Sequence, residues 1–111
     1  MQSTATLKFA SSGPRKVRYV ADMVRGEDVA RALKLLQLSK RGMASTVAKL
    51  IRSAVANAES TGNADVDALY IKELVVDGGP IHRRWRPRAH GRATRIRKRT
   101  SHIRVVLDDE R

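Results

Sequence analysis

The alternation of apolar and polar residues along the chain predicts three strands. Near the N-terminus, residues 4–9 alternate as in a half-buried strand whose apolar members are Ala5, Leu7 and Phe9. Near the C-terminus, residues 103–108 alternate in the same way, with the apolar members Ile103, Val105 and Leu107. The segment 69–76 alternates imperfectly, since it contains the consecutive residues Leu74, Val75 and Val76. This last pattern is typical of a strand that is covered on both faces.

Apolar residues at helical spacing predict three helices before residue 69. The first begins at Pro14, because proline is favoured in the first turn of a helix, and it ends at Gly26. Asp28 is placed to cap the second helix, and the third lies between Gly42 and Gly62. The apolar stripes of the three helices are Val17, Val20, Ala21 and Val24; Val29, Ala32, Leu33 and Leu36; and Ala44, Val47, Ala48, Ile51, Val55 and Ala58. These stripes can supply a small core.

Basic residues are concentrated in one part of the chain. The 111 residues include 23 Lys and Arg but only 11 Asp and Glu, which gives a net charge of +12 at neutral pH. Ten basic residues and no acidic residue lie between positions 80 and 104, namely Arg83, Arg84, Arg86, Arg88, Arg92, Arg95, Arg97, Lys98, Arg99 and Arg104. The rest of the chain is nearly neutral. Because self-repulsion on this scale adds nothing to folding stability, we expect a polyanionic partner.

The two strands that flank this basic segment can pair as one antiparallel hairpin. In a register whose paired positions add up to 178, the partners are Val75 with Ile103, Ile71 with Leu107, and Pro87 with Gly91. The tip then consists of Arg88, Ala89 and His90, and each arm projects about 40 Å at roughly 3.3 Å per residue. The length of the chain leaves room for one core, so residues 1–111 are expected to form a single domain with an extended hairpin at about 78–101.

The composition of the hairpin favours RNA as the polyanion. Arginine outnumbers lysine nine to one in the basic segment, and its planar guanidinium makes paired hydrogen bonds to phosphate and stacks on bases. Both faces of the hairpin carry cations, which suits folded RNA better than a single DNA groove. Trp85 offers a stacking surface, although an aromatic side chain at the base of a hairpin is also a common core residue. A charge run can also be a solvated face or a tail, but a tail seldom lies between two strands in register.

The sequence argues against catalysis, metal binding and membrane insertion. Cysteine is absent, and His82, His90 and His102 are widely spaced without neighbouring carboxylates. Gly78 and Gly79 precede a proline rather than the Lys-Ser/Thr of a phosphate-binding loop. No signal peptide or long apolar stretch is visible. We therefore expect a cytoplasmic protein with no cofactor, no metal, no small-molecule substrate and no membrane contact.

Several short segments of the chain resemble one known family. They are Gly13-Pro14-Arg15-Lys16-Val17-Arg18, Val24-Arg25-Gly26, Val55-Ala56-Asn57-Ala58-Glu59, Gly79-Pro80, Arg86-Pro87-Arg88-Ala89-His90-Gly91-Arg92-Ala93 and Lys98-Arg99-Thr100-Ser101-His102-Ile103. The resemblance is to the bacterial form of large-subunit ribosomal protein twenty-two, and it covers about residues 12–106. The hairpin string is the most specific part.

The resemblance implies an α+β fold of three helices packed on a three-stranded antiparallel sheet, with a long protruding basic β-hairpin. It implies a non-enzymatic protein on the ribosome that binds large-subunit ribosomal RNA, adjoins other large-subunit ribosomal proteins and lines the nascent-peptide tunnel. By position, the implied RNA-binding residues are Arg15, Lys16, Arg18, Arg25, Arg83, Arg84, Trp85, Arg86, Arg88, Arg92, Arg95, Arg97, Lys98, Arg99 and His102. The tip that faces the nascent chain comprises Arg88, Ala89, His90, Gly91 and Arg92.

Two residues depart from the pattern of this family. Gly78 stands where a glutamate is common before Gly-Pro, which could loosen the base of the hairpin. Glu27 stands where a basic residue is common after Arg-Gly, which puts an RNA contact at the start of the second helix in doubt. The alternative functions are a free-standing nucleic-acid regulator that reads DNA with a basic ribbon and, more weakly, a small basic nuclease, for which the basic segment offers no carboxylate.

Overall fold

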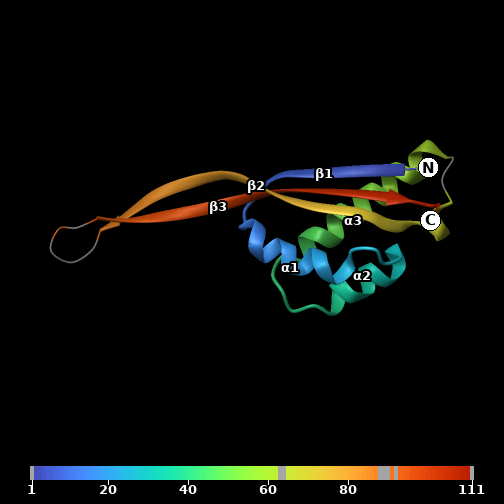
Figure 1. The fold of residues 1–111 in the computed structure, drawn as a ribbon, viewed down its shortest axis with the longest axis horizontal. Coiled ribbons are helices and arrows are strands. Elements are labelled where there is room, and N and C mark those ends of the chain that lie inside the picture. The colour runs from blue at the N-terminus through green and yellow to red at the C-terminus, as the bar shows by residue number, and fades with distance from the viewer. Residues whose placement is uncertain (1, 63–64, 88–90, 92, 111) are drawn as a thin grey trace.

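The computed structural model describes residues 2–62, 65–87, 91 and 93–110 of the chain. Within these residues the elements are β1 (Gln2–Ala10), α1 (Pro14–Val24), α2 (Val29–Leu38), α3 (Ala44–Thr61), the short 3-10 helix η1 (Val66–Ala68), β2 (Tyr70–Pro87) and β3 (Ala93–Asp108). The α+β fold with an antiparallel sheet and a long hairpin is confirmed (Figure 1).

The helices begin and end at the residues that local chemistry favours. Pro14 occupies the first turn of α1, and Asp28 occupies the N-cap position of α2. After α3, Gly62 has a positive φ of 72°, a left-handed conformation that glycine adopts without steric cost. The apolar stripes of the helices face inward, and Val17, Val20 and Ile51 are completely buried.

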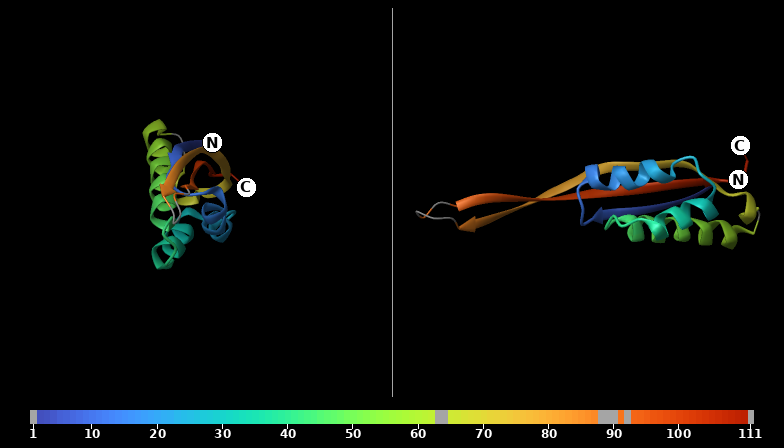
Figure 2. Two further views of the ribbon diagram at one scale, coloured as in Figure 1. Left: turned by 90° about the vertical axis from the view of Figure 1, so that its left-hand side faces the viewer. Right: turned by 90° about the horizontal axis from the view of Figure 1, so that it is seen from below.

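The sheet has the order β1–β3–β2, so the C-terminal strand lies in the centre. Figures 1 and 2 show all three helices on one side of the sheet. The central strand supplies the predicted alternation, because Ile103, Val105 and Leu107 are completely buried against the helices. Ile71 and Leu74 of β2 complete this core.

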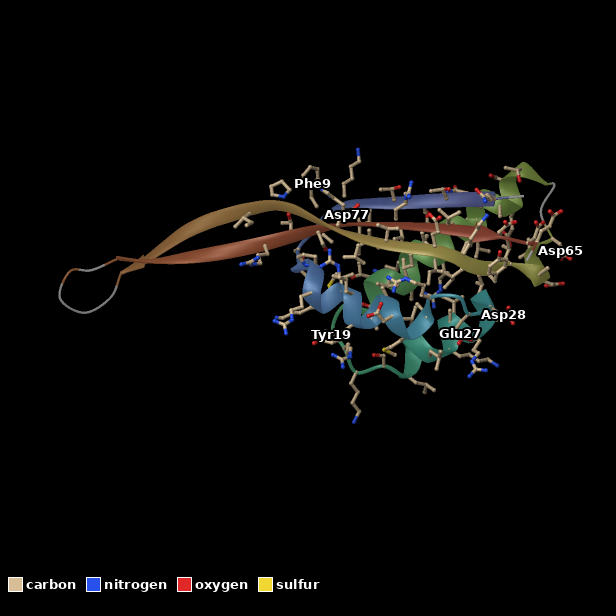
Figure 3. The ribbon with its side chains drawn as sticks, viewed as in Figure 1. Phe9, Tyr19, Glu27, Asp28, Asp65 and Asp77 are labelled. Atoms are coloured by element: carbon tan, nitrogen blue, oxygen red, sulfur yellow. The ribbon has the colours of Figure 1, made fainter. Side chains whose placement is uncertain are left out.

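The prediction that Phe9 belongs to the core is wrong. The alternation of β1 holds through Ala5 and Leu7, but the register shifts between Leu7 and Ala10, so that Ala10 is buried and Phe9 is 60 % exposed. Phe9 has a positive φ of 60°, which is uncommon for a bulky residue. A β-bulge therefore turns the ring out, and Figure 3 shows it on the side of the sheet opposite the helices.

The prediction that segment 69–76 is covered on both faces is also wrong. A second register shift between Ile71 and Glu73 resets the alternation, so that Leu74 and Val76 face the core while Lys72 and Glu73 are exposed. The extra residue lies before the apolar run, because a β-bulge places two residues of one strand opposite one residue of its partner. Within the run the burial alternates regularly, with Leu74 and Val76 buried and Val75 half-buried.

The hairpin register differs from the predicted one for the same reason. Ile71 pairs with Leu107 as predicted, but Ile103 pairs with Val76 rather than Val75. A further shift between Gly78 and Ile81 moves the pairing again, so Pro87 pairs with Ala93 rather than with Gly91. Together the two bulges move the middle of the connection by one residue. The predicted tip residues Arg88, Ala89, His90 and Arg92 lie outside the described residues, whereas Gly91 is described and has a positive φ of 71°.

The paired arms of β2 and β3 extend well beyond the helices. β1 ends at Ala10, which pairs with Ser101, and only β2 and β3 continue from there (Figures 1 and 2). The molecule measures 63 × 25 × 18 Å along its principal axes, so its length is set by this hairpin.

A glycine forms the tightest contact at the base of the hairpin. A Cβ atom added to Gly79 would lie 2.5 Å from Oγ1 of Thr100 and 3.3 Å from Nε2 of His102. The Thr100 hydroxyl donates a 2.6 Å hydrogen bond to the carbonyl of Pro80, across the register shift. Gly79 thus allows the two strands to approach closely where they leave the sheet.

The buried core lies entirely outside the projecting arms, which leads to a first prediction. Replacing residues 81–98 by a short turn should leave the three helices folded, because every residue of the core cluster lies before residue 77 or after residue 102. Far-ultraviolet circular dichroism of the shortened chain should retain the helical signal and a cooperative thermal transition. Loss of the cooperative transition would show that the arms are required for the core.

Candidate nucleic-acid interface

Four cationic side chains gather where α1 begins beside the base of the hairpin. A depression of about 730 Å³ is lined by Ser11, Ser12, Gly13, Pro14, Arg15, Lys16, Arg18 and Arg99. Gly13 lies directly against Arg99 of β3, because a Cβ atom added to this glycine would be 3.5 Å from Cβ of Arg99. The first turn of α1 contains no acidic residue. Helix N-terminal amides and nearby cations both attract anions, so this depression suits phosphate groups.

Two of the predicted RNA-binding arginines also stabilise the sheet. Nε and Nη2 of Arg18 both donate to the carbonyl of Val76, at 3.3 and 3.0 Å. Nε and Nη2 of Arg25 donate in the same way to the carbonyl of Leu74, at 3.2 and 2.8 Å, and its Nη1 donates to Asp22. Because β2 is an edge strand, its outward carbonyls would otherwise be open to pairing with another chain. The forked guanidinium groups cover this edge.

The segment between α1 and α2 covers the rest of the same edge. The N–H of Gly26 donates to the carbonyl of Ile71, and the N–H of Ile71 donates to the carbonyl of Glu27, at 3.1 and 3.0 Å. The N–H of Val29 donates to the carbonyl of Leu69 at 3.1 Å. The Glu27 side chain pairs with Arg31 at 3.2 Å. The departure at Glu27 therefore gives an ion pair within the protein, in keeping with the doubt about an RNA contact at this position.

A second prediction concerns the arginines on the edge strand. Arg25→Ala should lower the free energy of unfolding by about 1–2 kcal/mol, because the partly buried carbonyl of Leu74 loses a charge-assisted, two-pronged donor. Arg31→Ala, which removes only an exposed ion pair, should change it by less than about 0.5 kcal/mol. Urea denaturation of both variants measures the difference, and equal losses would refute a special role for the edge contact.

His102 links the end of β1 to the hairpin base. Its Nδ1 accepts a 3.0 Å hydrogen bond from the backbone N–H of Phe9, and the two rings meet edge to face with centroids 4.9 Å apart. The neutral ring therefore carries its hydrogen on Nε2. This contact orients His102 at the surface and gives it a structural role beside the predicted RNA contact.

Among the remaining predicted RNA-binding residues, Arg88 and Arg92 lie outside the described residues, and the others belong to the strands of the projecting arms. In the backbone pairing, Arg83 lies opposite Arg97, Trp85 opposite Arg95, and Arg86 opposite Thr94. Arg84 and Lys98 belong to the same two strands. The fold therefore brings the basic segment into one continuous ribbon that joins the depression at α1 through Arg99.

Two further depressions contain cations that the sequence analysis did not select. One of about 630 Å³ is lined by Ser11, Ser12, Lys16, Tyr19, Val20, Arg41, Gly42 and Met43. Another of about 290 Å³ is lined by Leu36, Gln37, Ser39, Arg41, Ala44, Ser45, Ala48, Lys49 and Arg52. We call the three adjoining depressions the basic track. The sequence does show Lys49 and Arg52 on the polar side of α3. It does not show that this side of α3 lies near the start of α1.

Acidic residues gather at the opposite end of the molecule. Asp108 lies at the end of β3, where a backbone N–H from Glu110 donates to its carboxylate at 3.2 Å and lowers its pKa. Lys72 lies 3.6 Å from the same side chain. Among the described residues no group of three metal-ligating side chains occurs, and no described helix is long and apolar enough to cross a membrane.

The chain is similar to known proteins over nearly its whole length. Residues 5–108 match the family model described as ribosomal protein L22p/L17e. The chain is 56% identical over 110 residues to the large ribosomal subunit protein uL22 of Geobacter sulfurreducens, with 99% of each chain covered. It is 55% identical to the protein of the same name from Geotalea daltonii over the full length of both, and 53% identical to that of Myxococcus xanthus, with 96% of each covered.

These matches span nearly the whole chain at an identity far above that needed to establish common descent. Members of this family are structural, non-enzymatic components of the large ribosomal subunit, which in bacteria is cytoplasmic. The resemblance seen in the sequence is thereby confirmed, and the chain belongs to the ribosomal protein L22p/L17e family.

Proposed function

We propose that this protein binds and organises large-subunit ribosomal RNA during assembly and lines the nascent-peptide exit tunnel with its hairpin. The observation that carries the proposal is the basic ribbon formed by β2 and β3, which projects from a nearly neutral folded part. An arginine-rich ribbon of this length gains little from folding on its own, and its charge is best neutralised when phosphates surround it.

In this proposal residues 1–111 act as one unit. The hairpin at about 78–101 reaches into the RNA, and the folded part holds its base. The start of α1 and Arg99 contact phosphates beside that base, since they share one depression. Neighbouring large-subunit ribosomal proteins are further partners, and the nascent chain is a transient one at the tip.

Fractionation of a cell lysate on a sucrose gradient tests this function. The protein should sediment with the large subunit at one copy per particle, as counted by quantitative mass spectrometry against other large-subunit proteins. A regulator that reads DNA with its ribbon would instead be found free or with DNA. Recovery of most of the protein outside ribosomal fractions would contradict the proposal.

A third prediction concerns the tip of the hairpin. The double variant Arg88→Gln, Arg92→Gln should enter large subunits at nearly normal yield, because eight of the ten basic residues between positions 80 and 104 remain. It should alter ribosome pausing on stalling-prone nascent peptides, because the local positive potential at the tunnel wall falls. Ribosome profiling beside a sedimentation profile measures both effects. A severe assembly defect with unchanged pausing would identify the two residues as RNA anchors instead.

A further inference from the structure

An exposed aromatic ring lies in the middle of the basic track. Tyr19 points outward from α1 and is 50 % exposed, although large aromatic side chains are usually buried (Figure 3). The guanidinium carbon of Arg41, from the segment between α2 and α3, lies 5.2 Å from the centre of the ring. This distance is typical of a cation–π contact. The contact joins two flat groups that can each stack on a planar ligand.

The surroundings of this pair are cationic and open. Tyr19 and Arg41 line the depression of about 630 Å³ together with Lys16, which lies one turn earlier on α1. This volume is within the range of pockets that hold small organic groups. None of the described residues that line the three depressions of the basic track is acidic. The site therefore favours a ligand that is both flat and negatively charged.

The positions of the neighbouring depressions indicate a strand rather than a single small molecule. The depression at Tyr19 shares Ser11, Ser12 and Lys16 with the depression at the start of α1. It shares Arg41 with the depression that contains Lys49 and Arg52. Cations thus lie on both sides of the aromatic ring, as the phosphates on either side of one nucleotide would require.

We propose that Tyr19 and Arg41 form a stacking site for one unpaired base of large-subunit ribosomal RNA. Lys16 holds the phosphate on one side of that nucleotide, and Lys49 and Arg52 hold the backbone on the other. Unpaired bases of folded RNA are commonly recognised by stacking on aromatic and guanidinium groups. This inference rests on the proposed function and extends it by assigning a base-stacking contact to Tyr19 and Arg41, beyond the phosphate contacts at the start of α1.

Binding of the purified full-length protein to a transcript of large-subunit ribosomal RNA tests the stacking step. Tyr19→Leu keeps a good helix former but removes the ring, and it should weaken binding about tenfold, while the slope of log affinity against log salt stays unchanged. Tyr19→Phe should bind like the parent protein. Met23→Ala, one turn later on α1 and outside the basic track, is the matched control and should also bind normally. If Tyr19→Leu binds as well as Met23→Ala, or if Tyr19→Phe is as weak as Tyr19→Leu, stacking is overturned.

Arg41→Gln separates the charge from the ring. It should weaken binding and also make the salt slope shallower by up to about one, because a cation near the phosphates is lost. An unchanged affinity would remove Arg41 from the site. Circular dichroism of each variant checks that the helices are retained.

Chemical probing of assembled particles identifies the nucleotide. In large subunits that contain the Tyr19→Leu protein, one unpaired base should become more reactive than in subunits with the parent protein or with Met23→Ala. If the variant enters particles and no base changes its reactivity, the inference fails while the proposed function stands. If the parent protein is absent from particles, the proposed function fails. A crosslink from position 19 to another protein would show that the depression holds a protein partner.

Discussion

Replacing Gly79 by alanine should lower the free energy of unfolding by about 2–3 kcal/mol and disturb the exit of the hairpin from the sheet. The new methyl group would lie 2.5 Å from Oγ1 of Thr100, a distance that requires atoms to move. Thr100 is 7 % exposed and its hydroxyl is held by the carbonyl of Pro80, so it cannot swing aside without losing that hydrogen bond. Overpacking costs about 1–3 kcal/mol, and a lost hydrogen bond adds about 1 kcal/mol.

The neighbouring glycine provides a matched control for this substitution. A Cβ atom added to Gly78 has its nearest neighbour, Cγ of Pro14, at 4.0 Å, which is ordinary van der Waals contact. Gly78→Ala should therefore be nearly neutral in urea denaturation. This control also addresses the family departure at Gly78, because a side chain fits there without strain. Equal destabilisation by the two variants would contradict the close approach of the strands at Gly79.

Neutralising six arginines of the hairpin should cause a much larger loss of RNA affinity than Tyr19→Leu or Arg41→Gln. The variant replaces Arg83, Arg84, Arg86, Arg88, Arg95 and Arg97 by glutamine. Each lost phosphate contact removes about 0.7–0.9 from the negative slope of log affinity against log salt, so the slope should become shallower by about four to five. Affinity for the ribosomal RNA transcript should fall by several orders of magnitude at low salt.

The control for this variant neutralises cations that are paired within the protein. Arg31, Lys72 and Arg104 each lie within 4 Å of a carboxylate and outside the basic track. Their replacement by glutamine should leave the salt slope nearly unchanged. A normal slope in the six-arginine variant would move the binding surface to the helices, where the basic track is the next candidate.

Local chemistry made the helices predictable from the sequence. Pro14 and Gly62 each favour an end of a helix through the conformation of the residue itself, and aspartate is a residue type that is common at the N-cap position that Asp28 occupies. The long hairpin was predictable because two apolar strands flank an unbroken basic segment. The helix ends and the hairpin could therefore be predicted from the sequence alone.

The register and the outward turn of Phe9 depend on contacts between distant strands. Each bulge inserts one extra residue into a strand, and the apolar pattern of the sequence does not show where. A strict alternation therefore places Phe9 in the core and pairs Val75 with Ile103. The two bulges between β2 and β3 raise the sum of two paired residue numbers by two, so the sum stays even. Odd-numbered residues of one arm therefore still lie opposite odd-numbered residues of the other. Arg83 therefore lies opposite another arginine of the basic segment, Arg97, in the observed register.

The contacts of the arginines with the edge strand and the position of the basic track could not be predicted either. Arg18 and Arg25 reach carbonyls of β2 only because α1 packs along this strand, which is an edge strand in the order β1–β3–β2. Arg41 reaches Tyr19 only because the segment before α3 returns to α1. Such contacts are set by topology, and charge counting alone cannot find them.

The most direct test of the proposed function is a photocrosslink from the tip of the hairpin to a nascent chain. Ribosomes that carry a photoreactive phenylalanine at position 89 are stalled with a radiolabelled peptide and irradiated, with position 66 as a control, because Val66 is 37 % exposed in η1 at the other end of the molecule. We expect a crosslink between the peptide and position 89 and none at position 66. A crosslink at position 66 alone, or at neither position in particles that contain the protein, would contradict a tunnel-lining hairpin.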